Sequence, residues 1–270
     1  MWRDWLWRIA QLLLSLLGAL AFASALATLS HPVHGVWGFL SAFSDDFSQA
    51  VRGHFGSSMV TAHAVADVVA QAWPATVRLA LAGGAIAFVL GVPLGILLSA
   101  SRLSRAAAPF IEIAAATPIF CAALLLIALD VHFANGAFAA VLPAFVVGTA
   151  GAACVQLALR RTAAIAAAEP YRAGLRLMGL GAWDIDLRYV LPQIIAGIAE
   201  NLGEIVLTLL AATAIVELVF GIDGAAPLFF KSAAAHDWNV AALVLLLFAT
   251  TKLVADFMGL VISRLLVAHP

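Results

Sequence analysis

The stretch EPYRAGLRLMGLGAWDIDLRYVLPQ, residues 169–193, differs from the sequence on either side of it. It holds six charged side chains, namely Glu169, Arg172, Arg176, Asp184, Asp186 and Arg188. Its surroundings consist mostly of Ala, Leu, Val, Ile and Phe. Of the 270 residues in the chain, 64% are hydrophobic and only 11% are charged, whereas a soluble domain carries about a quarter charged residues. So polar a segment inside so apolar a chain requires an explanation.

The composition places most of the chain in lipid rather than in water. Its mean hydropathy of +1.05 is far above that of a water-soluble domain. A spanning helix needs roughly 20 mostly apolar residues, and six segments meet that requirement: 6–29, 74–101, 107–129, 138–160, 190–220 and 239–267. We therefore predict an all-α membrane protein with one transmembrane domain over residues 1–270. The polar segment 30–73 between the first two spans is expected to form short amphipathic helices outside the membrane.

The basic residues indicate which side of the membrane each loop faces. Lys and Arg are enriched in cytoplasmic loops, and ten of the fourteen lie in residues 1–8, 102–106, 160–189 and 264–270. This distribution places both termini and the loop 161–189 in the cytoplasm. The first apolar segment is longer than that of a typical signal peptide, so we expect it to be retained as a spanning helix.

Within the quoted stretch the sequence predicts two short helices joined by a glycine turn. Residues 163–177 favour helix, with Pro170 tolerated near a first turn. Gly179-Leu-Gly181 is typical of a helix stop followed by a turn. A short amphipathic helix would follow over 183–189, before the chain re-enters the membrane at Leu191-Pro192. The alternative is an ordinary cytoplasmic loop that is basic only because the topology requires it.

The order of residues in this stretch resembles the EAA-type coupling loop of ABC-importer permeases. The shared features are Glu-x-Tyr at its start, small residues next, Gly-Leu five residues after Gly174, and Leu-Pro eleven residues past Leu180. In that family the loop docks into a groove on the ATPase subunit. The resemblance therefore implies coupling contacts by Glu169, Tyr171, Arg172, Ala173, Gly174, Arg176, Gly179, Leu180, Leu191 and Pro192.

Other motifs in the same order narrow the resemblance to permeases of the dipeptide, oligopeptide and nickel type. They are His54-Phe-Gly-Ser-Ser58, Pro74-Ala-Thr-Val-Arg-Leu-Ala-Leu81, Gly91-Val-Pro-Leu-Gly95, Thr117-Pro-Ile-Phe120, Val216-Glu-Leu-Val-Phe220 with the following glycines, His236-Asp-Trp238, and Asp256 in the last helix. Each motif alone is weak, but together they are specific. The resemblance covers roughly residues 5–267.

This resemblance implies a type I ABC-importer permease fold with six transmembrane helices and a cytoplasmic coupling helix, in the bacterial inner membrane. The chain would form half of the pore of an ATP-driven importer for peptides or related small solutes, with nickel or metal chelates as further candidate cargo. Implied partners are a second, paralogous permease, two ATPase subunits, an extracytoplasmic binding protein and membrane lipid. The chain would bind no cofactor and no nucleic acid, because ATP and Mg belong to the ATPase subunits.

The coupling stretch also departs from the family pattern. Leu175 and Leu177 stand where small residues are usual, and Met178 stands where a basic residue is common. The contact with an ATPase is therefore expected to be more apolar than in other family members.

Ionisable residues inside spans are costly and should face the bundle or a wet cavity. Lys252 and Asp256 are four residues apart on one helix face, so they can pair and fix helix packing. Glu200 and Glu204 share a face without a basic residue at helical spacing. They would line a wet path or contact partner helices. Glu217 is expected to act at a gate or as a helix cap. The candidates for the translocation path or its gate are therefore Glu200, Glu204, Glu217, Lys252 and Asp256.

The sequence lacks the motifs of a catalytic or metal site. G-x-x-x-x-G-K-[ST], H-E-x-x-H and G-x-S-x-G are absent, so we expect neither a phosphate-binding loop nor catalytic residues. His31 and His34 could suit a metal by spacing, but without a carboxylate or thiolate at ligand spacing we interpret them as interfacial. A stand-alone channel or intramembrane enzyme is the alternative function, although such a protein has no need of an ordered cytoplasmic helix pair.

Overall fold

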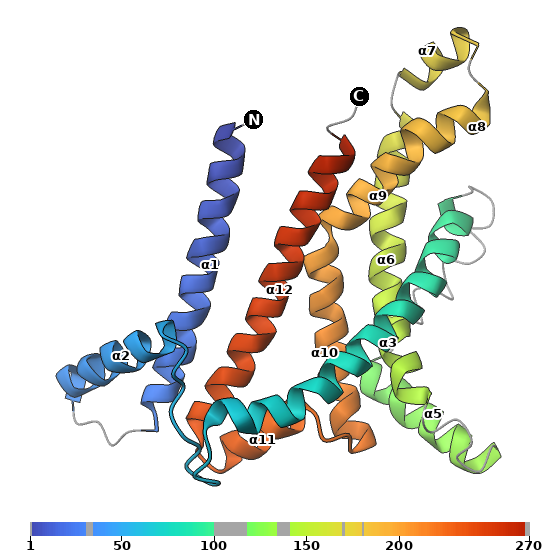
Figure 1. Ribbon diagram of the computed structural model, residues 1–270. Coiled ribbons are helices and arrows are strands. Elements are labelled where there is room, and N and C mark those ends of the chain that lie inside the picture. The colour runs from blue at the N-terminus through green and yellow to red at the C-terminus, as the bar shows by residue number, and fades with distance from the viewer. Residues whose placement is uncertain are drawn as a thin grey trace. The chain divides into compact units, whose positions relative to one another are not determined.

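The protein is helical almost throughout. The structure, a computed structural model, describes residues 2–30, 35–99, 118–133, 141–168, 171–179 and 181–267 (Figure 1). In these ranges a single isolated β-bridge joins Ser57 to Ala64. The helices are α1 (Trp2–Thr28), α2 (Gly35–Val51), α3 (Val65–Ser99), α5 (Ile119–Phe133), α6 (Leu142–Ala168), α7 (Tyr171–Leu177), α8 (Ala182–Ile185), the π-helix η1 (Asp186–Val190), α9 (Leu191–Glu200), α10 (Leu202–Phe220), α11 (Ala225–Ala234) and α12 (Trp238–Val267).

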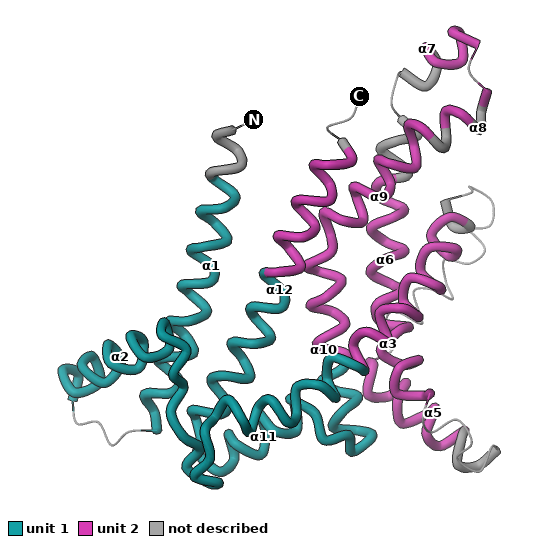
Figure 2. The backbone as a smooth tube through the Cα atoms, in the orientation of Figure 1, with its two compact units in different colours: residues 1–78, 213–253 teal, residues 79–212, 254–270 magenta. Residues whose placement is uncertain are grey.

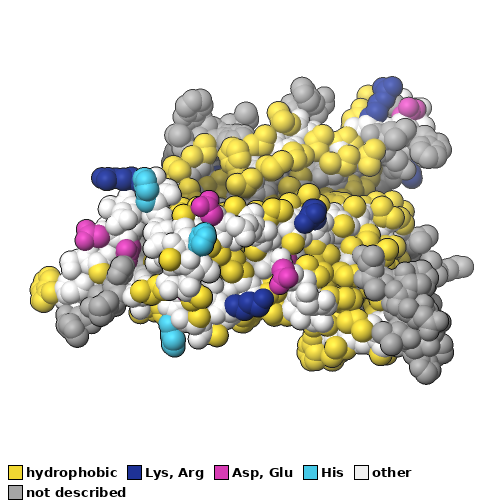
Figure 3. Space-filling model, turned by 60° about the horizontal axis from the view of Figure 1, so that its bottom comes forward, with side chains coloured by type: hydrophobic (Ala, Val, Ile, Leu, Met, Phe, Trp, Pro, Cys, Tyr) yellow, Lys and Arg dark blue, Asp and Glu magenta, His cyan; other side chains and the backbone are white. Residues whose placement is uncertain are grey.

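Within the described residues, five helices are long and apolar enough to cross a membrane. They contain Trp7–Thr28, Val65–Ile96, Leu142–Thr162, Leu202–Phe220 and Trp238–Leu266, and a shorter apolar helix covers Ile119–Leu129. These six helices correspond to the six predicted spans, in agreement with the predicted all-α membrane fold. Hydrophobic side chains cover most of the face seen in the space-filling view, and the charged side chains on it are scattered (Figure 3).

The helices differ from the predicted spans at several ends. α3 begins at Val65, nine residues before the predicted span that starts at 74. The predicted span 190–220 consists of two helices, α9 and α10, which are separated at Asn201. Parts of the second, third and fourth predicted spans, at 100–101, 107–117 and 138–140, lie outside the described residues. The polar segment 30–73 contains α2, a loop and the first turns of α3.

The chain divides into two compact units (Figure 2). Unit 1 comprises residues 1–78 and 213–253. In it α1 packs on α2, and a buried apolar cluster forms around Val65, Val240 and Val244. Trp73 meets Phe248 edge to face, with ring centroids 5.6 Å apart, a geometry that adds to the stabilisation from burial.

Unit 2 comprises residues 79–212 and 254–270. Its α3 and α6 approach closely because each presents a glycine to the other. A Cβ atom on Gly83 would overlap Val147, and one on Gly148 would overlap Ile86. In lipid, helices associate through such van der Waals packing rather than through a hydrophobic effect. Replacing Gly83 and Gly148 with alanine would therefore push α3 and α6 apart.

Candidate functional site

The predicted coupling segment, residues 169–193, lies at one end of unit 2. Figure 1 shows α7 and α8 beyond the ends of α6 and α9. α7 ends at Leu177, where Gly179 adopts a positive φ of 83° and donates its N–H to the Arg176 carbonyl at 3.0 Å. Glycine enters this left-handed region without a steric penalty. The glycine turn and a second short helix are present, whereas residues of the predicted helix 163–177 are divided between the end of α6 and α7. Glu169 and Leu180 lie outside the described residues.

The end of α7 exposes apolar side chains. Leu177 is 90% exposed and Met178 is 79% exposed. Gly174 and Arg176 are exposed as well, and a Cβ atom on Gly174 would meet nothing within 4 Å. The side chains of Tyr171, Arg172 and Ala173 are outside the described set. Among the described residues, none buries this apolar end of α7.

The coupling segment is fastened to the membrane part through α8, η1 and α9. Ile185 of α8 is buried, and η1 contacts both α8 and α9. Leu191 is exposed and Pro192 half-buried, with the proline in the first turn of α9, directly after the π-helix η1. α9 then packs on α6, where a Cβ atom on Gly197 would overlap Thr162.

A second group of polar contacts surrounds Glu217 in unit 1. This carboxylate is completely buried. Its Oε1 accepts the Thr76 hydroxyl at 2.5 Å, and its Oε2 accepts the Ala226 N–H at 3.0 Å. The Thr76 oxygen in turn accepts the Ala225 N–H at 2.8 Å. Glu217 and Thr76 thus cap the first turn of α11, whose N–H groups have no partners within the helix.

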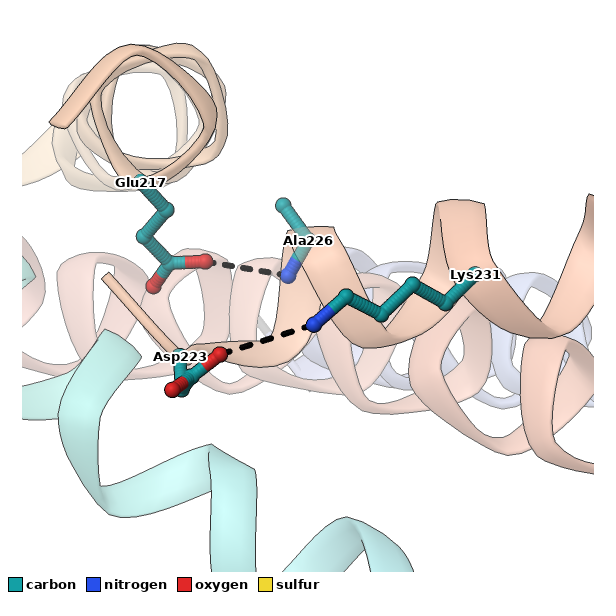
Figure 4. Close-up of polar contacts among 4 residues, drawn as sticks. All are labelled: Glu217, Asp223, Ala226 and Lys231. Atoms are coloured by element: carbon teal, nitrogen blue, oxygen red, sulfur yellow. Dashed lines mark hydrogen bonds and ion pairs between the residues drawn. The ribbon is translucent and has the colours of Figure 1, made fainter. Parts of the chain in front are cut away.

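The loop before α11 fits closely around this carboxylate. A Cβ atom on Gly224 would overlap the Glu217 carboxylate, so this position accepts only glycine without rearrangement. Figure 4 shows Glu217 directed at Ala226, with an ion pair between Lys231 and Asp223 nearby. The Lys231 Nζ and Asp223 Oδ1 atoms are 3.5 Å apart, and both side chains are exposed. Such an exposed pair contributes little to stability, whereas the buried Glu217 carboxylate joins the end of α10 to α3 and α11 through two hydrogen bonds.

Two further sequence motifs meet in unit 1. Ser58 donates its hydroxyl to Asp237 Oδ2 at 2.5 Å across 179 residues of sequence. The same hydroxyl oxygen accepts the Thr61 N–H at 3.1 Å. Asn239 donates to the Ser57 carbonyl at 3.2 Å. The Gly-Ser-Ser and His-Asp-Trp motifs therefore form one contact between the loop before α3 and the start of α12.

Thr76, Ser58 and Asp237 are absent from the residues that the sequence singled out. Each lies inside one of the motifs quoted above, so the sequence did mark the neighbourhood of these residues. Thr76 and Glu217 are separated by 141 residues, however, and polar residues this distant give no spacing pattern that would pair them. Only the folded chain brings these side chains together.

Comparison with known proteins assigns a family to this arrangement. Residues 87–267 match the family of the binding-protein-dependent transport system inner membrane component. The chain belongs to this family. A solved structure of the MetNI methionine ABC transporter, in inward-facing conformations, superimposes with a TM-score of 0.61 at 19% sequence identity. The match covers 73% of this chain and 95% of that one. No curated protein matches the chain.

Family membership confirms several predictions. The fold is that of a type I ABC-importer permease, and the chain is a non-catalytic transport component. It resides in the inner membrane as a multi-pass protein. The family also implies ATPase partners and a substrate-binding protein.

Besides Glu217, the ionisable residues predicted for the translocation path lie on three helices, α9, α10 and α12. Glu200 and Glu204 are exposed on either side of Asn201. Lys252 and Asp256 are half-buried on α12. A Cβ atom on Gly203 would overlap the Asp256 carboxylate, so Asp256 lies against the first turn of α10. The predicted pairing of Lys252 with Asp256 stays a prediction.

The histidines of the permease are dispersed where they can be placed. His54 and His63 are exposed in the loop before α3, whereas His31 and His34 lie outside the described residues. Among the described residues no group of three or more His, Cys, Asp or Glu side chains is arranged to hold a metal.

Proposed function

We propose that this permease is half of the translocation pore of an ATP-driven importer, and that residues 169–193 couple it to ATPase subunits. The observation that carries the proposal is the end of α7, where Leu177 and Met178 are exposed beside the open position Gly174. Fully burying a Leu or Met side chain stabilises by roughly 1.5–3 kcal/mol each. A partner groove that covers both would gain that energy.

A mechanism follows from how the coupling segment is attached. Movement of the ATPase subunits would displace α7, which η1 and α9 join to the membrane helices. Because α9 packs on α6 through Gly197 and Thr162, displacement of α7 would shift these two helices together. Alternating access requires two discrete states, and a helix held by a nucleotide-driven partner biases one of them.

We further propose that the cargo is a peptide or a related small solute, with nickel or a metal chelate as another candidate. The support is the set of motifs that resemble peptide and nickel permeases. Two of them contact one another through Ser58 and Asp237, and two others through Thr76 and Glu217. Glu200 and Glu204 would line the path, because both are exposed at positions within an apolar span.

The complete transporter would contain further subunits. We propose a second, paralogous permease as the other half of the pore, two ATPase subunits that hold ATP and Mg, and an extracytoplasmic binding protein. Both termini and the coupling segment would face the cytoplasm, in keeping with the concentration of basic residues there.

Gly174→Arg tests the coupling role. The position is open, so the new side chain should leave the fold intact but obstruct docking. We expect the tagged permease, solubilised from its host membrane, to retain its ATPase subunits, and the variant to lose most of them together with ATP-dependent uptake. Gly38→Arg is the matched control, because Gly38 is also a helical glycine with nothing within 4 Å of its Cβ position. Failure of the wild type to capture an ATPase, or full capture by Gly174→Arg, contradicts the proposal.

A further inference from the structure

The fifth apolar span is broken at a single residue. α9 ends at Glu200 and α10 begins at Leu202, and Asn201 between them has φ −98° and ψ 9°. Its side chain donates to the Gly197 carbonyl at 2.8 Å, and its own carbonyl accepts the Ile205 N–H at 3.0 Å. Figure 1 shows the two helices meeting at an angle. The break directly precedes the candidate membrane span Leu202–Phe220, and a break beside lipid persists where the surrounding protein satisfies and packs it.

α12 packs against both sides of this break. A Cβ atom on Gly203 would overlap the Asp256 carboxylate, and one on Gly259 would overlap the Ala199 carbonyl. Asp256 and Gly259 are three residues apart and therefore share a face of α12. The carboxylate thus meets the first turn of α10, while the glycine meets the last turn of α9.

The acidic residues Glu204 and Asp256 lie at the N-terminal end of α10, whereas Glu200 lies in the last turn of α9. A helix carries partial positive charge at its N-terminus and partial negative charge at its C-terminus. Asp256 offers negative charge to the positive end of α10. Gly259 presents no side chain to the negative end of α9, so the Ala199 carbonyl can approach the backbone of α12.

The two sides of the break have different attachments. On the α9 side, Gly197 packs on Thr162 of α6, and η1 continues into the coupling segment. On the α10 side, Gly151 of α6 and Ala87 of α3 lie close together with Leu209 beside them. Displacement of the coupling segment would therefore reach α10 through Asn201.

We propose that Asp256 and Gly259 clamp the break between α9 and α10, which is the pivot through which motion of the coupling segment reaches α10. Asp256 is a positioning residue, because it acts by holding the first turn of α10. The clamp follows from the contacts alone, whereas its part in transport rests on the proposed function.

The clamp can be tested by spin-label distances across the break. Ile195→Cys and Leu207→Cys, at exposed positions of α9 and α10, would be introduced with Cys121→Ser and Cys154→Ser. The full chain is studied in lipid nanodiscs with its copurified partners, first without nucleotide. We expect one narrow distance distribution. Asp256→Asn preserves volume but removes the charge, so misaligned conformers should increase roughly fivefold.

Further variants distinguish a clamp from general packing. Gly203→Ala should shift the distribution, whereas adding it to Asp256→Ser should leave the distribution of Asp256→Ser unchanged, because the overlapping carboxylate is gone. Gly84→Ala is the matched control, since its Cβ would be in ordinary contact with Leu209 at 3.4 Å, and the distribution should not change.

The outcomes separate the clamp from the transport proposal. A wild-type distribution in Asp256→Asn, or a further shift when Gly203→Ala is added to Asp256→Ser, overturns the clamp. ATP and Mg trapped with vanadate should shift the wild-type distance but not that of Asp256→Asn. If the clamp variants behave as expected without nucleotide and the trapped wild type does not shift, the pivot role is wrong while the clamp stands.

Discussion

Thr76 joins three helices of unit 1 through a single hydroxyl group. It donates to Glu217 on α10 and accepts from the first turn of α11, while it belongs to α3 itself. A hydroxyl can do both because it has one donor and two acceptor lone pairs. No carboxylate or amine of similar size could replace it without leaving one partner unsatisfied.

The first prediction concerns this hydroxyl. Thr76→Val keeps the shape but removes the donor and the acceptor, which leaves Glu217 and the Ala225 N–H buried with one bond fewer each. An unsatisfied buried polar group costs about 1–3 kcal/mol, so the thermal unfolding midpoint of the purified permease should fall clearly. Thr76→Ser retains the hydroxyl, so its unfolding midpoint should fall much less. Equal midpoints for the two variants would show that the hydroxyl is not what holds α11.

The second prediction concerns Ser58, the hydroxyl that bonds to Asp237. Ser58→Ala leaves Asp237 Oδ2 without its donor, and the fully buried Asp237 Oδ1 has no hydrogen-bond partner among the described residues. We expect a loss of about 1–3 kcal/mol, seen as a lower unfolding midpoint. Because the two side chains interact, Ser58→Ala combined with Asp237→Ala should cost less than the sum of the single variants.

Ser57→Ala provides the control for this contact. Ser57 is the neighbouring residue, and it engages Asn239 through its backbone carbonyl, which the substitution preserves. A midpoint as low as that of Ser58→Ala would assign the effect to the loop in general. Additive losses in the double variant would likewise argue against a direct bond between Ser58 and Asp237.

At the scale of elements, α7 combines a short helix with an unusually apolar end. The third prediction is that Leu177→Ser with Met178→Ser weakens capture of ATPase subunits at least about tenfold, since each buried side chain contributes roughly 1.5–3 kcal/mol. The measurement is quantitative copurification from detergent. Met59→Ser with Val60→Ser is the matched control, because these two adjacent residues are 64% and 65% exposed in a different loop. Undiminished capture by the α7 variant would remove the apolar end from the docking surface.

The elements show how far the sequence could predict this structure. Apolar runs identified the spanning helices, because hydropathy reports directly on the solvent around a segment. Hydropathy could not locate the start of α3 at Val65, because a helix can continue in water beyond the bilayer. The break at Asn201 was also missed. No proline interrupts residues 193–220, and the break depends on tertiary contacts with Asp256 and Gly259 on another helix.

The candidate site was predictable from the sequence only where its structure depends on residues that are neighbours along the chain. The glycine turn at Gly179 and the apolar end of α7 follow from neighbouring residues, and both were expected. The caps around Glu217 and Asp237 depend on Thr76 and Ser58, which lie more than a hundred residues away along the chain. A single sequence contains no covariation that would reveal such pairs.

At the scale of the molecule, the distribution of basic residues predicts which side of the membrane each loop faces. Ten of fourteen Lys and Arg residues lie in the segments that we assign to the cytoplasm, and such enrichment sets the orientation of multi-pass proteins. The coupling segment is among these segments. The loop that contains His63 would then face the opposite side, where a binding protein delivers cargo.

The fourth prediction tests this orientation by labelling introduced cysteines. In a chain with Cys121→Ser and Cys154→Ser, a membrane-impermeant maleimide should label His63→Cys in intact spheroplasts and Arg176→Cys only in inside-out vesicles. Both native side chains are exposed, so access to the reagent depends on the side of the membrane. Val147→Cys, at a completely buried position, should label in neither preparation. Labelling of both exposed positions from one side would contradict the orientation and, with it, docking of α7 to a cytoplasmic ATPase.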